Sequence, residues 1–497
     1  MESLQPVIEL LQAGKTASNS VDVKVYEKSF KEHEGVRLLM VKTSGVKYIL
    51  ATGSGALYND LQGEAIGENG KACALTHENR LVLNKYFAYT APQAFGTRVA
   101  TIGLGDRLGL ASPGHIETVR GHKVKPILAQ QSIRELTLTN RTMEDLIDAA
   151  AFAVFQEGYE DGYGADGDHI KEESDIRKAL DLGFSMLTLD CSDYIPTGID
   201  SKSLEEVRVD YEKLPQDVQH YYNEKYLDKT FDVNGLAISF DEETLVKYVL
   251  EYNEAIKYMV HVYNEYINKL DRDFDFEISI DETETITSPM AHFFVANELT
   301  SKGVKVTSLA PRFCGEFQKG IDYIGDVNQF EKELSEHALI AEYFSYKLSI
   351  HSGSDKFKVF PIIAKYTKGV LHVKTAGTNW LEAVRVIAQS NPELYSRMHQ
   401  FALDNFEETL KYYHVTPDLD SIDALEDVED KDLPNYMNDD AARQLLHVTY
   451  GLILSAKDED GNFVFKDEFF KTLDEHEDEY TNALVKHIGK HLETLGM

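Results

Sequence analysis

The stretch YKLSIHSGSDKF, residues Tyr346–Phe357, joins a short alternating run to a small polar turn. In its first half Leu348 and Ile350 alternate with Ser349 and His351, which is the period-2 pattern of a β-strand. The run then breaks into Ser-Gly-Ser-Asp-Lys. The strand therefore directs a histidine to the side opposite its aliphatic residues, and the role of that histidine depends on what this side faces.

Seven further segments repeat the rhythm of strand, polar turn and helix. They are VATIGLGD (Val99–Asp106), VKPILAQQS (Val124–Ser132), GYGADGDHI (Gly162–Ile170), FSMLTLDCSD (Phe184–Asp193), FDFEISIDE (Phe274–Glu282), VKVTSLAPR (Val304–Arg312) and GVLHVKTAG (Gly369–Gly377). Strands that alternate with helices predict a parallel sheet, and eight such units predict an α/β fold, a (β/α)8 TIM-like barrel. A doubly wound open sheet is the alternative.

The regions on either side of the repeat differ from it in character. Residues 1–98 hold short strand-like runs between glycine-rich turns and predict an N-terminal mixed α/β segment. Residues 99–390 form the predicted catalytic barrel, with a long, tyrosine-rich insertion near 193–239. Residues 391–497 have helical periodicity and predict a C-terminal helical extension.

The chain is strongly acidic, with 84 Asp and Glu residues against 50 Lys and Arg and a formal net charge of −34. Such a surface repels nucleic-acid phosphates and anionic lipids, so we expect neither a nucleic acid nor a membrane as partner. The three cysteines lie far apart without a metal-finger spacing, the N-terminus lacks the features of a signal peptide, and no apolar run approaches the ~20 residues of a membrane span. We therefore expect a cytoplasmic protein with a small-molecule substrate, and the sequence leaves a homo-oligomer open.

The predicted site lies at the carboxyl ends of the barrel strands, where barrel enzymes place their working residues. Alternation predicts that Leu348 and Ile350 pack outward on helices while His351 points into the barrel. The same count directs five more side chains inward: Glu277, Ser279, Asp281, His372 and Lys374. The side that His351 faces is therefore predicted to be a pocket.

Histidines directed into a pocket beside carboxylates suit a divalent cation, because imidazole and carboxylate are its usual ligands. We predict His169, His351 and His372, from three different strands, as the ligands of Zn, Mn, Ni, Co or Fe. An acid among Glu277, Asp281 and Glu282 is an alternative to His372 or a further ligand. The competing interpretation is that one or more of these histidines are buried, hydrogen-bonded structural groups.

Acid–base chemistry requires two groups on opposite sides of a substrate. Asp168, next to His169, and Glu282, across the barrel, are the predicted pair, and Glu277 on the inward face is the rival to Glu282. Asp168 and Glu282 are equally well explained as helix N-caps or salt-bridge partners.

Positive charge is scarce in this chain, so lysines and arginines at strand ends favour an anionic substrate. The turn at residues 352–354 and the stretch at 375–378 each precede a helix, and backbone N–H groups there are suited to hold an anion. Simple helix capping by Ser354 and Thr378 is the alternative. The predicted substrate contacts are Arg312, Ser352, Asp355, Lys356, Lys374, Thr375 and Asn379.

The stretch TIGLGDRLG, Thr101–Gly109, imitates a dinucleotide-binding fingerprint. Its third glycine is loosely spaced, and no clear strand ending in an acid follows about 20 residues later, as that fingerprint requires. The sequence therefore disfavours a nicotinamide cofactor.

Five longer motifs stand at the positions already singled out. They are GADGDHIK (Gly164–Lys171), ISIDETET (Ile278–Thr285), APRFCGEFQKGIDYIGD (Ala310–Asp326), IHSGSDKF (Ile350–Phe357) and HVKTAGTNWLEAVR (His372–Arg385). In these motifs the sequence resembles the tagaturonate/fructuronate epimerase family. The resemblance implies a metal-dependent isomerase of hexuronate catabolism that interconverts D-fructuronate and D-tagaturonate at C4; some members of such families also accept fructose and tagatose. It favours Asp168 and a glutamate of the EISIDE strand as acid/base groups, and His169, His351 and His372 as metal ligands.

The two sugar acids differ at C4, whose hydrogen is not acidified by the C2 carbonyl. A base that takes the C4 hydroxyl proton, with a metal holding the C2 and C3 oxygens, would allow retro-aldol cleavage and re-addition to the other face. Two other functions fit the same residues: a metal-dependent aldolase or lyase acting on sugar acids, and a non-catalytic sugar-acid binding protein.

Overall fold

The structure is a computed structural model that describes residues 2–16, 19–281 and 285–497. The chain forms two compact units. The first comprises Met1–Gln93, Leu104–Ala165 and Ala376–Lys490, and the second comprises Ala94–Gly103, Asp166–Thr375 and His491–Met497. The division into an N-terminal segment, a barrel and a C-terminal extension stays a prediction.

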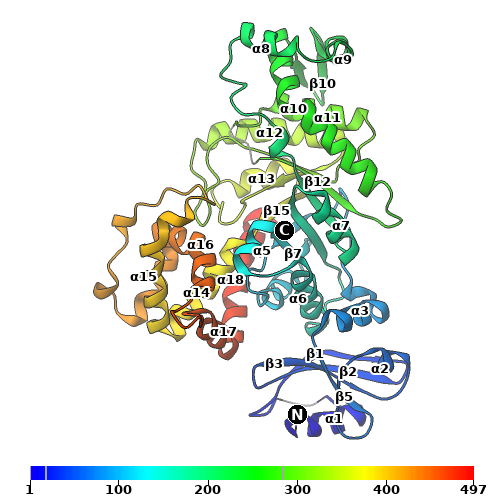
Figure 1. Ribbon diagram of the computed structural model, residues 1–497, viewed down its shortest axis with the longest axis vertical. Coiled ribbons are helices and arrows are strands. Elements are labelled where there is room, and N and C mark those ends of the chain that lie inside the picture. The colour runs from blue at the N-terminus through cyan, green and yellow to red at the C-terminus, as the bar shows by residue number, and fades with distance from the viewer. Residues whose placement is uncertain (1, 17–18, 282–284) are drawn as a thin grey trace. The chain divides into compact units, whose positions relative to one another are not determined.

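The described part of the first unit contains a five-stranded antiparallel sheet in the order β1-β2-β3-β5-β4 (Figure 1). The strands are β1 Lys24–His33, β2 Val36–Thr43, β3 Val46–Thr52, β4 Glu64–Ala65 and β5 Gly70–Ala74. Helices of this unit include α1 Gln5–Gln12, α2 Ala56–Asp60, α3 His77–Tyr86, α4 Ser112–Val119, α5 Ile133–Thr139 and α6 Met143–Gln156. Along β2, Leu39 shares an apolar cluster with Leu11 of α1, and Leu38 shares another with Phe155 of α6. Because successive side chains point to opposite faces, β2 is buried on both of its faces.

A helical cluster of the same unit is built from the chain after residue 376. Its helices are α14 Gly377–Ser390, α15 Pro392–Thr409, α16 Asp440–Ser455, α17 Lys466–Glu475 and most of α18 Glu477–Leu495. Trp380 of α14 is buried, and its indole N–H donates to the carbonyl of Leu446 in α16 at 2.8 Å. A buried tryptophan with a satisfied N–H contributes a large apolar area at no polar cost, so it anchors α14 on α16.

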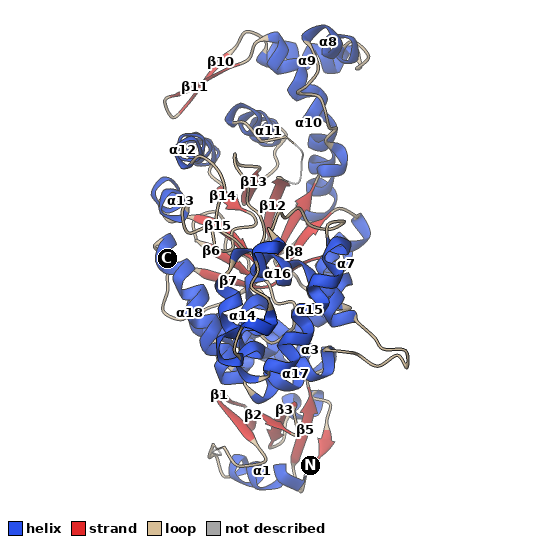
Figure 2. Ribbon diagram, turned by 90° about the vertical axis from the view of Figure 1, so that its left-hand side faces the viewer, coloured by secondary structure: helices blue, strands red, loops and turns tan. Residues whose placement is uncertain are grey.

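Within the described residues, eight strands close into a barrel in the order β12-β13-β14-β15-β6-β7-β8-β9 (Figure 2). They are β6 Thr101–Leu104, β7 Lys125–Ser132, β8 Gly164–Ile170, β9 Met186–Asp190, β12 Asp275–Ile280, β13 Ser308–Pro311, β14 Lys347–Ile350 and β15 Leu371–Thr375. Each lies inside one of the eight segments predicted to be strands, and the TIM-like barrel is confirmed. β14 and β15 are parallel, with Ser349 opposite His372.

The second unit adds helices that follow the barrel strands. They are α7 Glu173–Leu182, α10 Glu242–Val262, α11 Pro289–Ser301, α12 Val327–Phe344 and α13 Phe360–Thr367. Figure 2 shows α11, α12 and α13 one after another beside β12, β13 and β14. This is the strand–helix alternation that the sequence pattern predicts for a parallel barrel.

The tyrosine-rich insertion folds as two helices and a hairpin: α8 Leu204–Tyr211, α9 Gln216–Tyr226, β10 Thr230–Val233 and β11 Leu236–Ser239. The ring of Tyr226 lies 5.1 Å from that of Phe240 and 5.1 Å from that of Phe294 in α11. Edge-to-face and tilted ring contacts of this kind bury a large apolar area, which explains the aromatic content of the segment.

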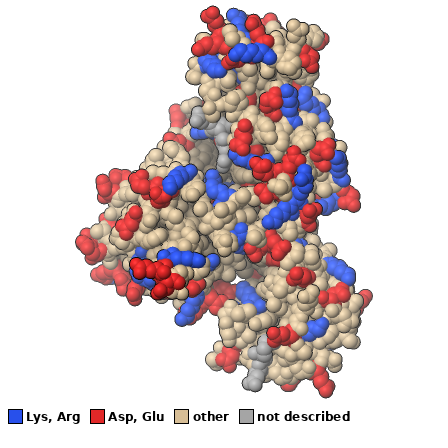
Figure 3. All heavy atoms as spheres, in the orientation of Figure 1, with Lys and Arg blue, Asp and Glu red and all other residues tan. Residues whose placement is uncertain are grey.

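Acidic side chains are spread over the face drawn in Figure 3, with basic ones interspersed among them. This distribution is that of a solvated surface. No described helix combines the length and the apolar character needed to cross a lipid bilayer.

Candidate active site

Strands β14 and β15 carry inward-facing side chains at two depths of the barrel. Lys347, the first residue of β14, donates to the carbonyl of Val99 at 3.1 Å and contacts the Oγ1 of Thr101 at 3.0 Å. Because side chains alternate along a strand, Ser349 and His351 face the same side as Lys347. His351 directly follows β14 and therefore lies at its carboxyl end.

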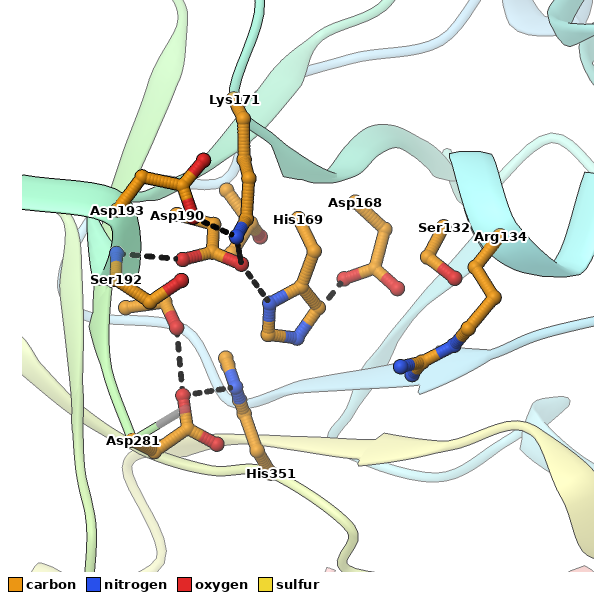
Figure 4. Close-up of polar contacts among 12 residues, drawn as sticks. Ser132, Arg134, Asp168, His169, Lys171, Asp190, Ser192, Asp193, Asp281 and His351 are labelled. Atoms are coloured by element: carbon orange, nitrogen blue, oxygen red, sulfur yellow. Dashed lines mark hydrogen bonds and ion pairs between the residues drawn. The ribbon is translucent and has the colours of Figure 1, made fainter. Parts of the chain in front are cut away.

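Three side chains bring ligand atoms together at this end: His169, Asp281 and His351 (Figure 4). One donor atom from each lies within 4.8 Å of those of the other two. The Nδ1 of His351 is 3.0 Å from the Oδ1 of Asp281, and the rings of His169 and His351 are 4.8 Å apart. Donors that share a divalent cation at ~2.1 Å lie about 3–3.4 Å apart. The pair His351–Asp281 has this spacing, and two imidazoles with a carboxylate are a donor set that suits such a cation.

His169 reaches this group because β8 is irregular near its end. The pairing of β8 with β9 shifts register between Gly167 and Ile170, and His169 has a φ of 49°, in the left-handed region. In a regular strand Asp168 and His169 would face opposite sides, whereas a bulge re-aims one of two neighbouring side chains. Both residues therefore reach the interior, and the strained backbone of His169 is of the kind that clusters at functional sites.

Lys374 of β15 joins several polar groups beside this cluster. Its Nζ is 2.6 Å from the Oδ1 of Asp168 and 3.0 Å from the Oε1 of Glu277. It is also 3.1 Å from the Oδ2 of Asp166 and 2.6 Å from the Oγ1 of Thr188. Burial by itself would lower the pKa of Lys374, but the three carboxylates raise that pKa well above its ordinary value. The side chain is therefore held as an ammonium ion.

The three carboxylates around Lys374 are not equivalent. Burial raises the pKa of Asp166 to about 6, although Lys374 opposes the shift. Burial would also raise the pKa of Asp168, but Lys374 and His169 outweigh it, and the pKa falls below its ordinary value. The pKa of Glu277 falls well below its ordinary value for the same reason, with Lys374 again outweighing burial. Asp168 and Glu277 are therefore firmly ionised at neutral pH, whereas Asp166 is the carboxyl of the three that takes up a proton most readily.

Glu277 lies fully buried in the middle of β12 and connects this group to His351. Its Oε1 is 2.8 Å from the Nε2 of His351, and its Oε2 accepts a hydrogen bond from Ser308 at 2.5 Å. A carboxylate on one ring nitrogen orients an imidazole and directs the other nitrogen outward. Here the other nitrogen, Nδ1, faces Asp281. Burial would lower the pKa of His351, but Asp281 outweighs it and the pKa is raised.

The structure does not bring His372, the third predicted ligand, to this group. Its Nδ1 is 2.8 Å from the Oγ1 of Thr101, one layer deeper in the barrel. Burial lowers the pKa of His372 to about 3, although Glu277 opposes the shift. Among the described residues, the Nε2 of His372 has no hydrogen-bond partner. Asp281, one of the acids considered as its alternative, stands with His169 and His351 instead.

Two further side chains at the mouth connect β8 to the segment after β9 (Figure 4). The Nζ of Lys171 is 2.6 Å from the Oδ1 of Asp193 and 3.8 Å from the Oδ2 of Asp190. The same Asp190 oxygen is 3.8 Å from the Nδ1 of His169. Asp190 therefore faces the Nδ1 edge of the His169 ring.

Three predicted substrate contacts lie in the turn after β14. Ser352 has its Oγ 3.0 Å from the Nζ of Lys319. Asp355 is buried and has a φ of 60°. Lys356 is fully buried, and its ammonium donates to the carbonyls of Gln318 at 2.9 Å, Ile321 at 2.5 Å and Ser354 at 2.8 Å. The hydrogen bonds of Lys356 therefore join this turn to the loop after β13.

The other predicted residues are more scattered. Thr375 donates from Oγ1 to the carbonyl of Gly103 at 2.9 Å, and Asn379 donates from Nδ2 to the carbonyl of Gly105 at 2.6 Å. The backbone of Arg312 is hydrogen-bonded to Thr287, and its side chain is half-buried. Glu282, one of the predicted acid/base groups, lies outside the described residues.

Sequence reasoning gave no role to four residues of this cluster: Asp166, Thr188, Asp190 and Ser308. Thr188 donates to Asp166 at 2.8 Å and lies 3.1 Å from the Oε1 of Glu277. One sequence feature could have identified such residues: a polar side chain on the inward face of an otherwise apolar strand. Such a side chain needs a hydrogen-bonding partner when it is buried. The partner itself comes from another strand and is not visible in the sequence.

The comparison with known proteins gives a consistent result. The tagaturonate epimerase family model matches residues 26–495. The chain is 42% identical over 476 residues to a tagaturonate/fructuronate epimerase of Thermotoga maritima, which covers 95% of this chain and 97% of that one. It is 59% identical to a fructuronate-tagaturonate epimerase from Cohnella laeviribosi, whose native and glycerol-complexed crystal structures each superpose with a TM-score of 0.95 and 100% coverage of both chains.

Proposed function

The chain belongs to the tagaturonate epimerase family, and we propose that it interconverts D-fructuronate and D-tagaturonate by inverting the configuration at C4. One feature of the structure supports this reaction independently of the family membership. Three metal-type donors, His169, Asp281 and His351, stand directly beside the ionised carboxylates Asp168 and Glu277. A base next to a cation site is what cleavage and re-formation of a carbon–carbon bond beside a carbonyl requires.

We propose that His169, Asp281 and His351 hold a divalent cation such as Zn, Mn, Ni, Co or Fe. The donor set supports this, because three protein ligands with a remaining open position are typical of catalytic sites. A cation bound there would supply Lewis-acid polarisation of the substrate's carbonyl oxygen. His372 is assigned a structural role, since its Nδ1 is 2.8 Å from Thr101.

Asp168 is the proposed base. Its carboxylate accepts the C4 hydroxyl proton as the C3–C4 bond breaks, the pair of that bond forms a C2–C3 double bond, and the carbonyl pair moves onto O2. After the C4 aldehyde has turned, the pair returns to C4 on its other face and Asp168 gives the proton back to O4. Lys374 contacts Oδ1 of Asp168 at 2.6 Å, so we assign the proton transfer to Oδ2. Glu277 keeps the His351 ring in place and is the second proposed acid/base group.

The substrate's carboxylate and hydroxyls are proposed to contact residues at the strand ends, among them Arg312, Ser352, Asp355 and Thr375. Lys374 and Lys356 are less suited to this task than the sequence suggested. The ammonium of Lys374 is surrounded by carboxylates, and that of Lys356 donates to three carbonyls. We propose that both lysines support the site rather than the substrate.

We propose that the reaction takes place in the cytoplasm. Cys73, Cys191 and Cys314 are buried and unbridged, which is consistent with a reducing compartment.

The test is incubation of the purified protein with D-fructuronate, followed by NMR, with and without exhaustive removal of metal by a chelator. The expected result is D-tagaturonate as the product, loss of turnover on chelation, and recovery with one of the five metals. Cleavage products without tagaturonate would make the protein an aldolase or lyase, and binding without turnover would make it a sugar-acid binding protein. The same measurement with D-fructose, which lacks the carboxylate, shows how much that carboxylate contributes to kcat/KM.

A further inference from the structure

We infer that His491, six residues before Met497, is a positioning residue that holds the turn after β14 and thereby the candidate metal ligand His351. The segment His491–Met497 belongs to the same compact unit as β14. His491 lies 136 residues further along the chain than the residue it contacts, Asp355. The inference rests on the proposed function, because it takes His351 as a ligand of the cation.

The contact between His491 and the turn is specific in its chemistry. The backbone N–H of Asp355 donates to the Nε2 of His491 at 3.0 Å, and both residues are buried. An amide N–H only donates, so Nε2 carries the lone pair, and the ring proton is on Nδ1. That lone pair is therefore engaged by the backbone of the turn. The imidazole ring also lies 4.9 Å from the ring of Phe357 and 5.6 Å from that of Phe360.

The turn that His491 contacts is strained. Ser352 has a φ of 48° and Asp355 a φ of 60°, and both residues carry a Cβ that disfavours this left-handed conformation. Such a backbone persists only where its surroundings determine it. Ser352 directly follows His351, so the direction of the His351 side chain depends on the turn keeping this conformation.

Other contacts hold the turn from its remaining sides. The N–H of Gly353 donates to the carbonyl of Lys374 in β15 at 3.0 Å. The ammonium of Lys356 reaches the carbonyls of Gln318 and Ile321 in the loop after β13. These partners belong to neighbouring barrel strands and their loops. The acceptor for the N–H of Asp355, the second strained residue, is instead His491 of the C-terminal segment. Loss of that acceptor leaves a buried N–H unpaired and favours relaxation of the turn.

Two substitutions separate the acceptor from the ring. His491→Gln places an amide oxygen near the position of Nε2 and keeps the acceptor, while it removes the ring contacts. His491→Phe keeps the ring contacts with Phe357 and Phe360 and removes the acceptor. A second comparison, of His491→Gln with His491→Asn, depends only on the length of the side chain. The glutamine amide extends to the N–H of Asp355, whereas the shorter asparagine side chain does not.

The variants are compared with the wild type by three measurements on the full-length protein. Hydrogen–deuterium exchange of the peptide spanning residues 351–357 reports on the turn without any metal or substrate. Titration with Zn²⁺ or Co²⁺ after chelation reports on metal affinity. Steady-state kinetics with D-fructuronate separate kcat from KM.

We expect His491→Phe to accelerate exchange in this peptide and to weaken metal affinity by about 10- to 100-fold, as is typical when the support of a metal ligand is lost. The kcat of His491→Phe falls together with its metal affinity, while its KM changes little. The metal affinity and kcat of His491→Gln stay within a few-fold of the wild-type values. Unchanged exchange and affinity in His491→Phe would overturn the inference, as would a loss in His491→Gln equal to that in His491→Phe. If His491→Phe does not fold, the comparison of His491→Gln with His491→Asn decides in the same way. A wild type that binds no metal and turns over no substrate would instead count against the proposed function, while the exchange measurement still judges the turn.

Discussion

The same two strands, β14 and β15, each carry a basic side chain at two depths of the barrel, and the two layers behave in opposite ways. The upper layer holds His351 and Lys374. The lower layer is the pair Lys347 and His372, which start two residues apart in the strand register but whose side chains both reach the Oγ1 of Thr101. In the upper layer the pKa values of both basic groups are raised, because Asp281 acts on His351 and three carboxylates act on Lys374, in each case outweighing burial. In the lower layer burial lowers the pKa of Lys347 to about 8 and that of His372 to about 3.

The difference comes from depth rather than from residue type. Ser349 is the register partner of His372, so His351 lies two residues, or about 7 Å, further toward the carboxyl ends of the strands. At that level Asp168, Glu277 and Asp281 converge, whereas the lower layer offers the hydroxyl of Thr101. A histidine among carboxylates is suited to hold a cation, and one paired with a hydroxyl in a closed core is suited to packing.

The largest expected effect separates the two histidines by activity. We expect His351→Ala to lower kcat/KM for D-fructuronate by at least about 1,000-fold, because it removes a proposed ligand of the cation. His372→Ala is the matched control and should lower kcat/KM by less than about tenfold, while it reduces the free energy of unfolding by about 1–3 kcal/mol. Similar losses of activity in both variants would show that the two layers do not differ in function.

The two lysines are distinguished by stability. Lys374→Met leaves Asp166, Asp168 and Glu277 without their shared cation, and we expect it to lower the free energy of unfolding by about 3 kcal/mol. Lys347→Met removes an ammonium that burial already disfavours, and its loss should be about 1 kcal/mol. Urea unfolding at pH 7.5 measures both. A Lys347→Met variant as unstable as Lys374→Met would contradict the distinction between the layers.

Strand β12 offers the same comparison with carboxylates. Glu277→Gln should lower kcat by about 100-fold, because the amide neither accepts a proton nor orients His351 as the carboxylate does. Asp275, two residues earlier, accepts the backbone N–H groups of Phe95 and Gly96 at 2.7 and 2.8 Å. Asp275→Asn should therefore change kcat by less than about tenfold while it destabilises the fold. The pH dependence of kcat, measured alongside, should change for Glu277→Gln alone.

The smallest expected effect is in the pH dependence of stability, measured by urea unfolding of chelator-treated protein at pH 7.5 and pH 5. The folded pKa of His372 is about 3, so the contribution of His372 to stability declines as pH falls below 6.5, where only the unfolded chain binds the proton. His351 has a raised folded pKa and contributes stability that is present below pH 6.5 and lost as pH rises through the folded pKa. The penalty of His372→Gln should therefore shrink at pH 5, by up to about 2 kcal/mol, while the penalty of His351→Gln grows. Penalties that change in the same direction would contradict the opposite pKa shifts.

The barrel was predictable because its signal is local and repeated. Each strand carries an alternating or apolar run, each is followed by a turn and a helix, and all eight predicted segments contain a barrel strand. Of the predicted ligands, His169 and His351 come together with Asp281, whereas His372 joins Thr101 in the lower layer. Alternation along a strand tells which face a side chain occupies, but it does not tell how deep that residue sits relative to its neighbours.

Depth is set by the register between strands that lie far apart in the sequence, and by the irregular end of β8 that turns both Asp168 and His169 inward. The contact between His491 and Asp355 is of the same kind, since 136 residues separate the two. The amino-acid sequence alone determined the strand–helix repeat, the inward face of β12, β14 and β15 and the kind of chemistry their polar residues suit, because these follow from periodicity and residue type. Only the tertiary structure decided which histidine stands among the carboxylates and which is paired with a hydroxyl, because that depends on the stagger of the closed barrel, which a linear pattern does not encode.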